Sequence, residues 1–126
     1  MANVFAIFLG AGFGGVLRYL LTLALKGEYH GHFPLPTFVI NITGCFAIGF
    51  LTTFFEHAFP IRQSWALGIT VGVLGGFTTF STFGRETFIL LGEAKPLIAL
   101  WYVLASNVIG VALAFAGHML AKSMQT

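Results

Sequence analysis

Charged side chains are scarce in this sequence, and aspartate is absent altogether. Only 8% of the 126 residues are Asp, Glu, Lys or Arg, whereas soluble domains carry about a quarter. So few charges cannot cover a water-facing surface, which excludes a soluble globular domain, and the high apolar content excludes a disordered chain. Six Lys and Arg against four Glu are too sparse to form a nucleic-acid-binding patch. The single cysteine rules out a disulfide within the chain.

Long apolar stretches take the place of the missing charges. Hydrophobic residues make up 57% of the chain, and a helix needs about 20 of them to cross the hydrocarbon core of a bilayer. Four stretches have the necessary length: residues 4–25, 37–55, 64–91 and 96–121. The connections between them are short and carry most of the remaining polar residues. The sequence therefore predicts an all-α membrane protein with four transmembrane helices, forming a single transmembrane domain over residues 1–126.

The basic residues near the ends of the four spans divide evenly between the two sides of the membrane. One side would carry Arg62 and Lys122, and the other Lys26 and Lys95. Most membrane proteins show a clear excess on the cytoplasmic side. The tie favours a chain that inserts in both orientations, which would permit an antiparallel homodimer. A weak bias toward one orientation is the alternative interpretation.

Small residues recur at helical spacing within the spans. Gly10 and Gly14 share one face of the first span, and Gly68, Gly72 and Gly76 form a continuous row on the third. Because lipid provides no hydrophobic drive between helices, close contact depends on such small side chains. The pattern indicates a tight bundle without a wide aqueous lumen, so any transported species must be small.

Residues 75–84 contain three glycines and four hydroxyl residues, which makes them a poor helix inside the third span. A break here would free backbone carbonyls, and in a bilayer these need protein, water or an ion as partner. Broken helices near mid-membrane are a recurring way of building ion sites. The alternative is an unbroken helix whose hydroxyls bond back to the preceding turn. The doubled glycine and the phenylalanines at spacing three favour a break near mid-membrane.

Neutral hydrogen-bond donors and aromatic rings accompany this segment. Phenylalanine ring edges carry partial positive charge. The Asn41 amide offers two N–H donors in the second span, although a contact between helices is an equal alternative for it. On the fourth span, Tyr102, Ser106 and Gly110 share a face at spacing four. Such a track, without fixed positive charge, suits a small anion that must lose its water without being trapped.

Three charged residues fall inside or directly after the apolar stretches. Arg18 lies about two helical turns from the end of the first span and is expected to extend toward the membrane interface. Arg85 and Glu86 follow the polar segment, and Glu86 would lie at a pore mouth or pair with either arginine. The four histidines lack metal-ligand spacing. Without a nucleophile and base, a phosphate loop or a zinc motif, the chain is not expected to be an enzyme.

Three of these segments carry a family resemblance. Residues 14–19, 37–44 and 75–83 together resemble the Fluc/CrcB family of bacterial fluoride channels. The likeness extends over essentially the whole chain, and the third motif is highly specific. It implies a fluoride-specific ion channel that passively exports fluoride and so lowers its cytoplasmic concentration and toxicity. It also implies a multi-pass protein of the bacterial inner membrane that forms an antiparallel, dual-topology homodimer with two pores.

The resemblance also implies roles for individual residues. It implies a structural Na⁺, which is not transported, held at the dimer centre by the backbone carbonyls of Gly75 and Thr78. Arg18 belongs to the first motif. The anion pathway would be lined by Thr37, Asn41, Phe80, Phe83, Glu86, Tyr102 and Ser106. Gly110 stands where some relatives carry a further hydroxyl, so the far end of this track departs from the family pattern.

Two other classes of protein are alternatives. A small multidrug-resistance-type exporter also has four spans and dual topology, but it needs a membrane-embedded carboxylate in its first span, where this chain has Arg18 and no acid. A non-transporting membrane assembly subunit would use the same phenylalanines and glycines for packing alone. The flux of anions through the purified protein distinguishes all three.

Overall fold

The computed structural model describes residues 1–28, 31–58 and 63–125, and over these ranges the only regular elements are helices. In chain order they are α1 (Ala2–Glu28), α2 (Leu35–Ala58), α3 (Gln63–Leu67), η1 (Gly68–Val73), α4 (Leu74–Phe77), α5 (Phe80–Gly92) and α6 (Pro96–Ser123). Four segments are long and apolar enough to cross a membrane: Ala2–Lys26, Leu35–Glu56, Ser64–Gly92 and Pro96–Ser123. The predicted all-helical architecture with four helices capable of crossing a membrane is confirmed. Arg62 and His30, and the side chain of His57, lie outside the described residues.

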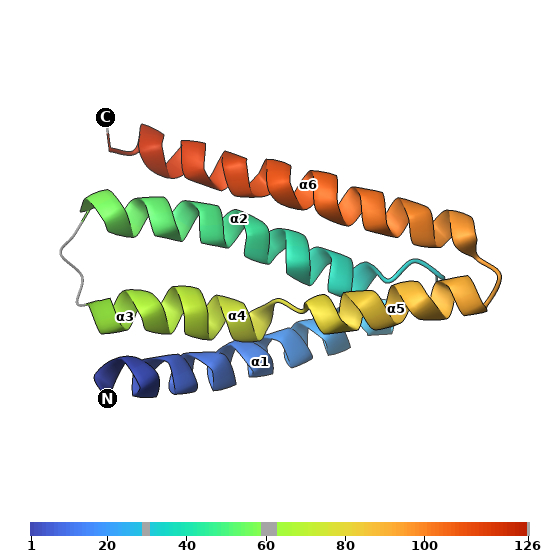
Figure 1. Cartoon of the computed structure of the whole chain (residues 1–126), viewed down its shortest axis with the longest axis horizontal. Coiled ribbons are helices and arrows are strands. Elements are labelled where there is room, and N and C mark those ends of the chain that lie inside the picture. Colours follow the sequence, from blue (N-terminus) through green and yellow to red (C-terminus); the bar gives the residue numbers. More distant parts are fainter. Residues whose placement is uncertain (29–30, 59–62, 126) are drawn as a thin grey trace.

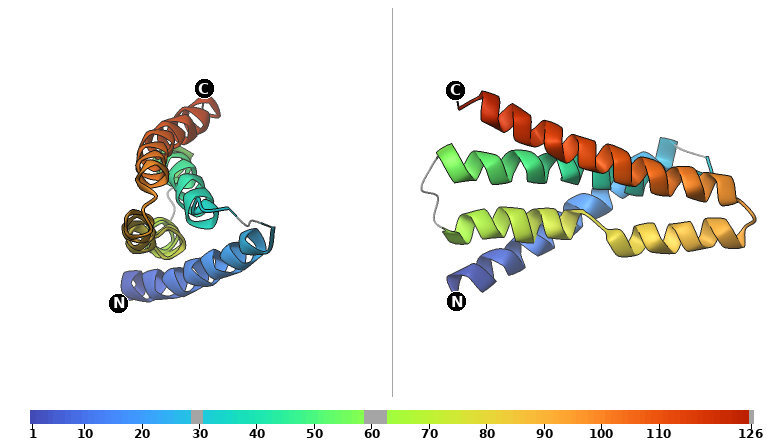
Figure 2. Two further views of the ribbon diagram at one scale, coloured as in Figure 1. Left: turned by 90° about the vertical axis from the view of Figure 1, so that its right-hand side faces the viewer. Right: turned by 45° about the horizontal axis from the view of Figure 1, so that its top comes forward.

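The helices form an elongated bundle in which α2 and α6 run side by side (Figure 1). The third span runs through α3, η1 and α4 and then continues in α5, and α1 crosses this row obliquely (Figure 2). Within the row, η1 has the wider turns of a π-helix, a form that often marks functional segments. Both chain ends lie at the same end of the bundle (Figure 1), as an even number of spans requires.

Glycines bring the helix backbones together at two places in the bundle. A Cβ atom on Gly10 of α1 would collide with the carbonyl oxygen of Gly68, and one on Gly117 of α6 would collide with the carbonyl oxygen of Phe46 in α2. Any larger side chain at either position would force the helices apart. The close packing predicted for the first and third spans is therefore confirmed, and α2 and α6 pack in the same way.

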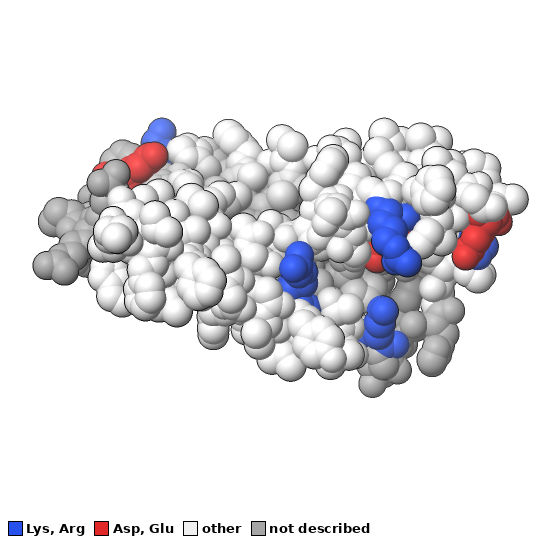
Figure 3. Space-filling view, turned by 60° about the horizontal axis from the view of Figure 1, so that its bottom comes forward, with Lys and Arg blue, Asp and Glu red and all other residues white. Residues whose placement is uncertain are grey.

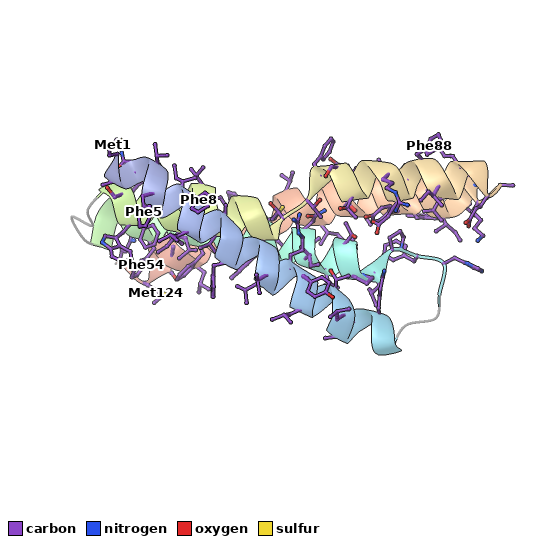
Figure 4. The ribbon with its side chains drawn as sticks, turned by 90° about the horizontal axis from the view of Figure 1, so that it is seen from below. Met1, Phe5, Phe8, Phe54, Phe88 and Met124 are labelled. Carbon is purple, nitrogen blue, oxygen red and sulfur yellow. The ribbon has the colours of Figure 1, made fainter. Side chains whose placement is uncertain are left out.

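The outer surface of the bundle is apolar, while its buried core is small. Phe5 and Phe8 of α1 and Phe88 of α5, labelled in Figure 4, are largely exposed. The buried core gathers at the α5–α6 end, around Leu90, Ala99 and Tyr102. Lipid chains solvate exposed apolar side chains as well as a protein interior does. This distribution is that of a multi-pass membrane protein.

The third span leaves helical geometry at two residues. Helix α4 ends at Phe77, and Thr78 (φ −77°, ψ 160°) and Thr79 (φ −151°, ψ 110°) are extended before α5 begins at Phe80. The interruption lies within the polar segment of residues 75–84, and it is visible as a short non-helical connection in Figure 1. Its depth in a bilayer stays a prediction.

Candidate functional site

Two adjacent threonines shape the interruption of the third span. The Thr78 hydroxyl donates to the Leu74 carbonyl at 2.9 Å, which closes the last turn of α4. The Thr79 hydroxyl oxygen accepts from the Thr82 backbone N–H at 3.2 Å and so caps the start of α5. The sequence left two possibilities open: the hydroxyls bond back to the preceding turn of a continuous helix, or they lie at a break in the helix. In the structure, the Thr78 hydroxyl bonds back to the preceding turn, and the Thr79 hydroxyl caps the helix that follows the break.

The Asn41 side chain of α2 binds the peptide of Thr79 through two reciprocal hydrogen bonds. Its Nδ2 donates to the Thr79 carbonyl at 3.0 Å, and its Oδ1 accepts from the Thr79 N–H at 2.8 Å. In a continuous helix that N–H would donate to the carbonyl of Gly75, four residues earlier. Asn41 thus connects two spans and also diverts a hydrogen bond from the Gly75 carbonyl. One N–H of the amide is left over for another acceptor.

Arg18 of α1 points to the interruption and not to the membrane interface that the sequence indicated. Its guanidinium donates from Nη1 to the Thr78 carbonyl at 3.2 Å. The side chain is half-buried. Because Thr78 is extended, its backbone carbonyl does not accept a helical N–H. This carbonyl is therefore free to accept from Arg18. A cationic group therefore lies beside the interrupted backbone.

The Glu86 carboxylate of α5 is held by hydroxyl groups from two other helices. Thr37 Oγ1 in α2 donates to Oε1 at 2.9 Å, and Tyr102 OH in α6 donates to Oε2 at 2.8 Å. Thr37 and Tyr102 are both buried. Among the described residues no ion pair joins Glu86 to Arg18 or Arg85, the alternative that the sequence had allowed. Three of the predicted pathway residues therefore meet in one hydrogen-bonded group.

The predicted phenylalanines continue from this group toward the surface of the chain. The ring of Phe83 lies 5.0 Å from that of Tyr102 and 5.5 Å from that of Phe80, measured between centroids. Phe80 is 83% exposed on the single chain. Phe77 is elsewhere, against Gly44 of α2. The rings of Tyr102, Phe83 and Phe80 thus form an aromatic row that leads from the core outward.

A cavity of about 400 Å³ opens beside this row, which we call the apolar cavity. Its lining comes from the second, third and fourth spans: Asn41, Gly44, Cys45, Ile48, Thr70, Leu74, Gly75, Thr78, Thr79, Phe80, Phe83, Ser106 and Asn107. The hydroxyl oxygen of Ser106 is buried and has no hydrogen-bond partner among the described residues. A buried hydroxyl normally finds a partner. This one is a donor available to whatever enters the cavity.

A second hollow, of about 700 Å³, lies on the opposite side of Thr79, and we call it the basic vestibule. Arg18, Lys26 and Arg85 line it together with two carboxylates, those of Glu86 and Glu93, so basic side chains outnumber acidic ones. Figure 3 shows basic side chains gathered on this face of the molecule. At its rim, Lys95 donates to Glu93 at 2.7 Å and holds the pKa of that carboxyl below its ordinary value. A hollow lined by positive charge raises the local concentration of anions.

The carbonyls predicted to hold sodium differ in their surroundings. Gly75 is exposed, with no heavy atom within 4 Å of the position its Cβ would take, and its carbonyl has lost the Thr79 N–H to Asn41. The Thr78 carbonyl already accepts from Arg18, which leaves one lone pair. Hard cations prefer several oxygen ligands, and the two predicted carbonyls are too few to hold one by themselves. The residues fit a cation site only if a second copy supplies further oxygens.

Thr79 and Cys45 are among the residues of the site that the sequence pattern did not single out. Thr79 lines both hollows and provides the peptide that Asn41 binds. A hydroxyl residue directly before a helix start is an N-cap signal, and applied to residues 79–82 it would have identified Thr79. Cys45 lines the apolar cavity, and no pattern in the sequence indicated it. All seven predicted pathway side chains lie within the hydrogen-bonded group, the aromatic row or the apolar cavity.

Known proteins with similar sequences have a common name. A family profile described as CrcB-like protein, Camphor Resistance (CrcB), matches residues 5–118. A protein of Methylobacterium nodulans named Fluoride-specific ion channel FluC is 45% identical over 112 residues, which are 89% of this chain and 90% of that protein. Proteins of the same name from Oceanobacillus iheyensis and Aquifex aeolicus are 42% and 36% identical, covering 96% and 98% of this chain and 92% and 100% of theirs. The chain belongs to the CrcB-like protein family.

Proposed function

We propose that this protein is a fluoride-specific ion channel that exports fluoride passively and lowers its cytoplasmic concentration and toxicity. The names of its relatives support the proposal. The observation in the structure that carries it is the apolar cavity. There the Ser106 hydroxyl, which has no partner among the residues that the structure describes, and the Asn41 amide meet the aromatic row. The protein would act in the inner membrane of a bacterium.

The arrangement of charge suits the passage of a small anion. An unpaired ion costs tens of kcal/mol in a medium of low dielectric constant by continuum estimates, so donors must replace its water. Neutral hydroxyl and amide donors and the positive edges of phenylalanine rings do this without a fixed charge that would trap the ion. The cations Arg18, Lys26 and Arg85 stand in the basic vestibule, outside the apolar cavity. They would attract the anion without binding it inside.

An antiparallel homodimer would complete the pathway. Phe80 is 83% exposed on the single chain, and the polar residues Ser81 and Asn107 are exposed beside it, on a surface that lipid would otherwise cover. Exposing polar groups to hydrocarbon costs free energy, so we expect a second copy of the chain to cover this surface. Protease access to a C-terminal tag should detect both insertion orientations in the membrane. A single protected orientation would contradict this assembly.

A structural Na⁺ at the centre of that dimer would join the two interrupted spans. The Gly75 carbonyl, whose helical N–H partner is bound by Asn41, supports this site, and Thr78 would add a second oxygen. The same two carbonyls of the other copy would bring the ligands to four. The ion would be held permanently and not transported. It would also place positive charge near the anion path without a lysine or arginine side chain.

The flux of fluoride from loaded proteoliposomes tests the function and separates the three classes of protein. A channel should release fluoride with no proton gradient, provided that a potassium ionophore lets a counter-ion follow. An exporter of the multidrug-resistance type should need the gradient, and an assembly subunit should release none. Either of these last two results would overturn the proposal.

A further inference from the structure

The Cys45 thiol lies beside Gly110 of α6, next to the apolar cavity. Cys45 is one helical turn after Asn41 on α2, and both line the cavity together with Ser106 of α6. A methyl group placed on Gly110 of α6 would be 3.2 Å from the Cys45 sulfur, the nearest heavy atom to it. The thiol therefore fills the space that a side chain at position 110 would occupy.

The hydroxyl groups on the inner face of α6 stop before this point. Tyr102, Ser106 and Gly110 follow one another at spacing four. Tyr102 donates to Glu86, and the buried oxygen of Ser106 has no partner in the part of the chain that the structure describes. The third position, Gly110, is buried but has no side chain. At position 110, one helical turn beyond Ser106, an ion would meet no side-chain donor from α6.

We propose that the Cys45 thiol extends the ion pathway beyond Ser106 by supplying from α2 the donor that α6 lacks at Gly110. The S–H group is a weak donor, and the neutral thiol adds no charge that would hold the anion. Sulfur is also polarizable and packs well against apolar neighbours, which suits its place beside Gly110. The inference rests on the proposed function, because it names a further residue that lines the same pathway.

Three variants of Cys45 distinguish a polar role from simple packing. Cys45→Ser keeps a donor of similar size, and Cys45→Ala removes it. Cys45→Ala combined with Gly110→Ser moves the donor across to α6, into the space that the sulfur vacates. Thr52→Ala is the matched control, because it removes a hydroxyl from the same helix that bonds back to the Ile48 carbonyl at 2.7 Å. Rates of fluoride efflux are compared after size-exclusion chromatography has shown that each variant is folded and assembled as the unmodified protein is.

The rate of fluoride efflux should depend on whether a hydrogen-bond donor is present beside Gly110, and not on the volume of the side chain there. We expect Cys45→Ala to slow efflux roughly tenfold, the order expected when an ion loses one donor. Cys45→Ser and the double variant should remain within about threefold of the unmodified protein, which is well inside that tenfold loss, and Thr52→Ala should not differ from it. Unchanged efflux in Cys45→Ala would overturn the inference, as would Cys45→Ser and the double variant both being as slow as Cys45→Ala. These results leave the proposed function intact, whereas an unmodified protein that passes no fluoride would overturn both.

Discussion

Glu86 shows how single side chains make a carboxylate tolerable within a membrane span. The Thr37 and Tyr102 hydroxyls each donate to one of its oxygens. Tyr102→Phe removes one donor and leaves the ring in place, so we expect the free energy of unfolding in detergent to fall by about 1.5–3 kcal/mol. Tyr19→Phe is the matched control, because Tyr19 is largely exposed on α1. Equal losses in both variants would show that the Glu86 contact contributes nothing specific.

The aromatic row gives a second prediction at the scale of single residues. Phe80→Ile and Phe83→Ile keep apolar bulk but remove the positive ring edge, so fluoride flux should fall by orders of magnitude while the protein stays folded. Phe77→Ile should be much milder, because Phe77 packs against Gly44 and lines neither hollow. Efflux from proteoliposomes measures all three. If Phe77→Ile alone abolished flux, the pathway would run along the other face of the third span.

At the scale of elements, Asn41 decides where the third span is interrupted. In Asn41→Asp, a carboxylate oxygen would replace the N–H donor that now lies 3.0 Å from the Thr79 carbonyl. Two acceptors would face each other, and a negative charge would stand where the anion passes. We expect fluoride flux to be lost and backbone amides at the start of α5 to exchange hydrogen faster.

Asn3→Asp is the matched control for that substitution. Asn3 accepts a hydrogen bond from the Ser64 hydroxyl, and an aspartate accepts it equally well. Flux and amide exchange should therefore stay near those of the unmodified protein. If Asn41→Asp behaved like Asn3→Asp in both measurements, the reciprocal contact with Thr79 would not hold the interruption in place.

The sequence predicted elements well wherever composition alone determines them. The four apolar stretches correspond to the four spans because a bilayer sets the length of an apolar helix. The π-type turns of η1 were not predicted, because they depend on how α1 packs against Gly68 and Gly72. The partner of Arg18 was missed for a similar reason. Its acceptor, Thr78, is 60 residues away in the chain and is brought close only by the oblique crossing of α1.

The site was predicted as a set of residues, but their connections were not. Asn41, Phe83 and Ser106 could be identified because polar and aromatic residues in an apolar span are conspicuous. Which donor binds which acceptor depends on the rotation of each helix about its axis, which the sequence pattern does not fix. For that reason Glu86 was left with several possible partners, and the place of Cys45 beside Gly110 was not foreseen.

At the scale of the whole molecule, the assembly should depend on sodium. If the carbonyls of Gly75 and Thr78 hold Na⁺ between two copies, replacing it by a large organic cation should abolish fluoride flux or weaken the dimer. Efflux and the molecular mass in detergent are measured on the same preparation, with Na⁺ restored as the control. Flux and mass that stay unchanged after thorough removal of Na⁺ would contradict a sodium site at these carbonyls.

The reversal potential in a planar bilayer tests the central claim most directly. The protein is placed between solutions of equal ionic strength with a tenfold gradient of fluoride, and chloride makes up the difference. A fluoride-specific channel should pass no current near the fluoride equilibrium potential, about 59 mV from zero for a monovalent ion. A reversal potential near zero would mean that chloride passes equally well. That result would contradict an anion path selected by neutral donors and ring edges.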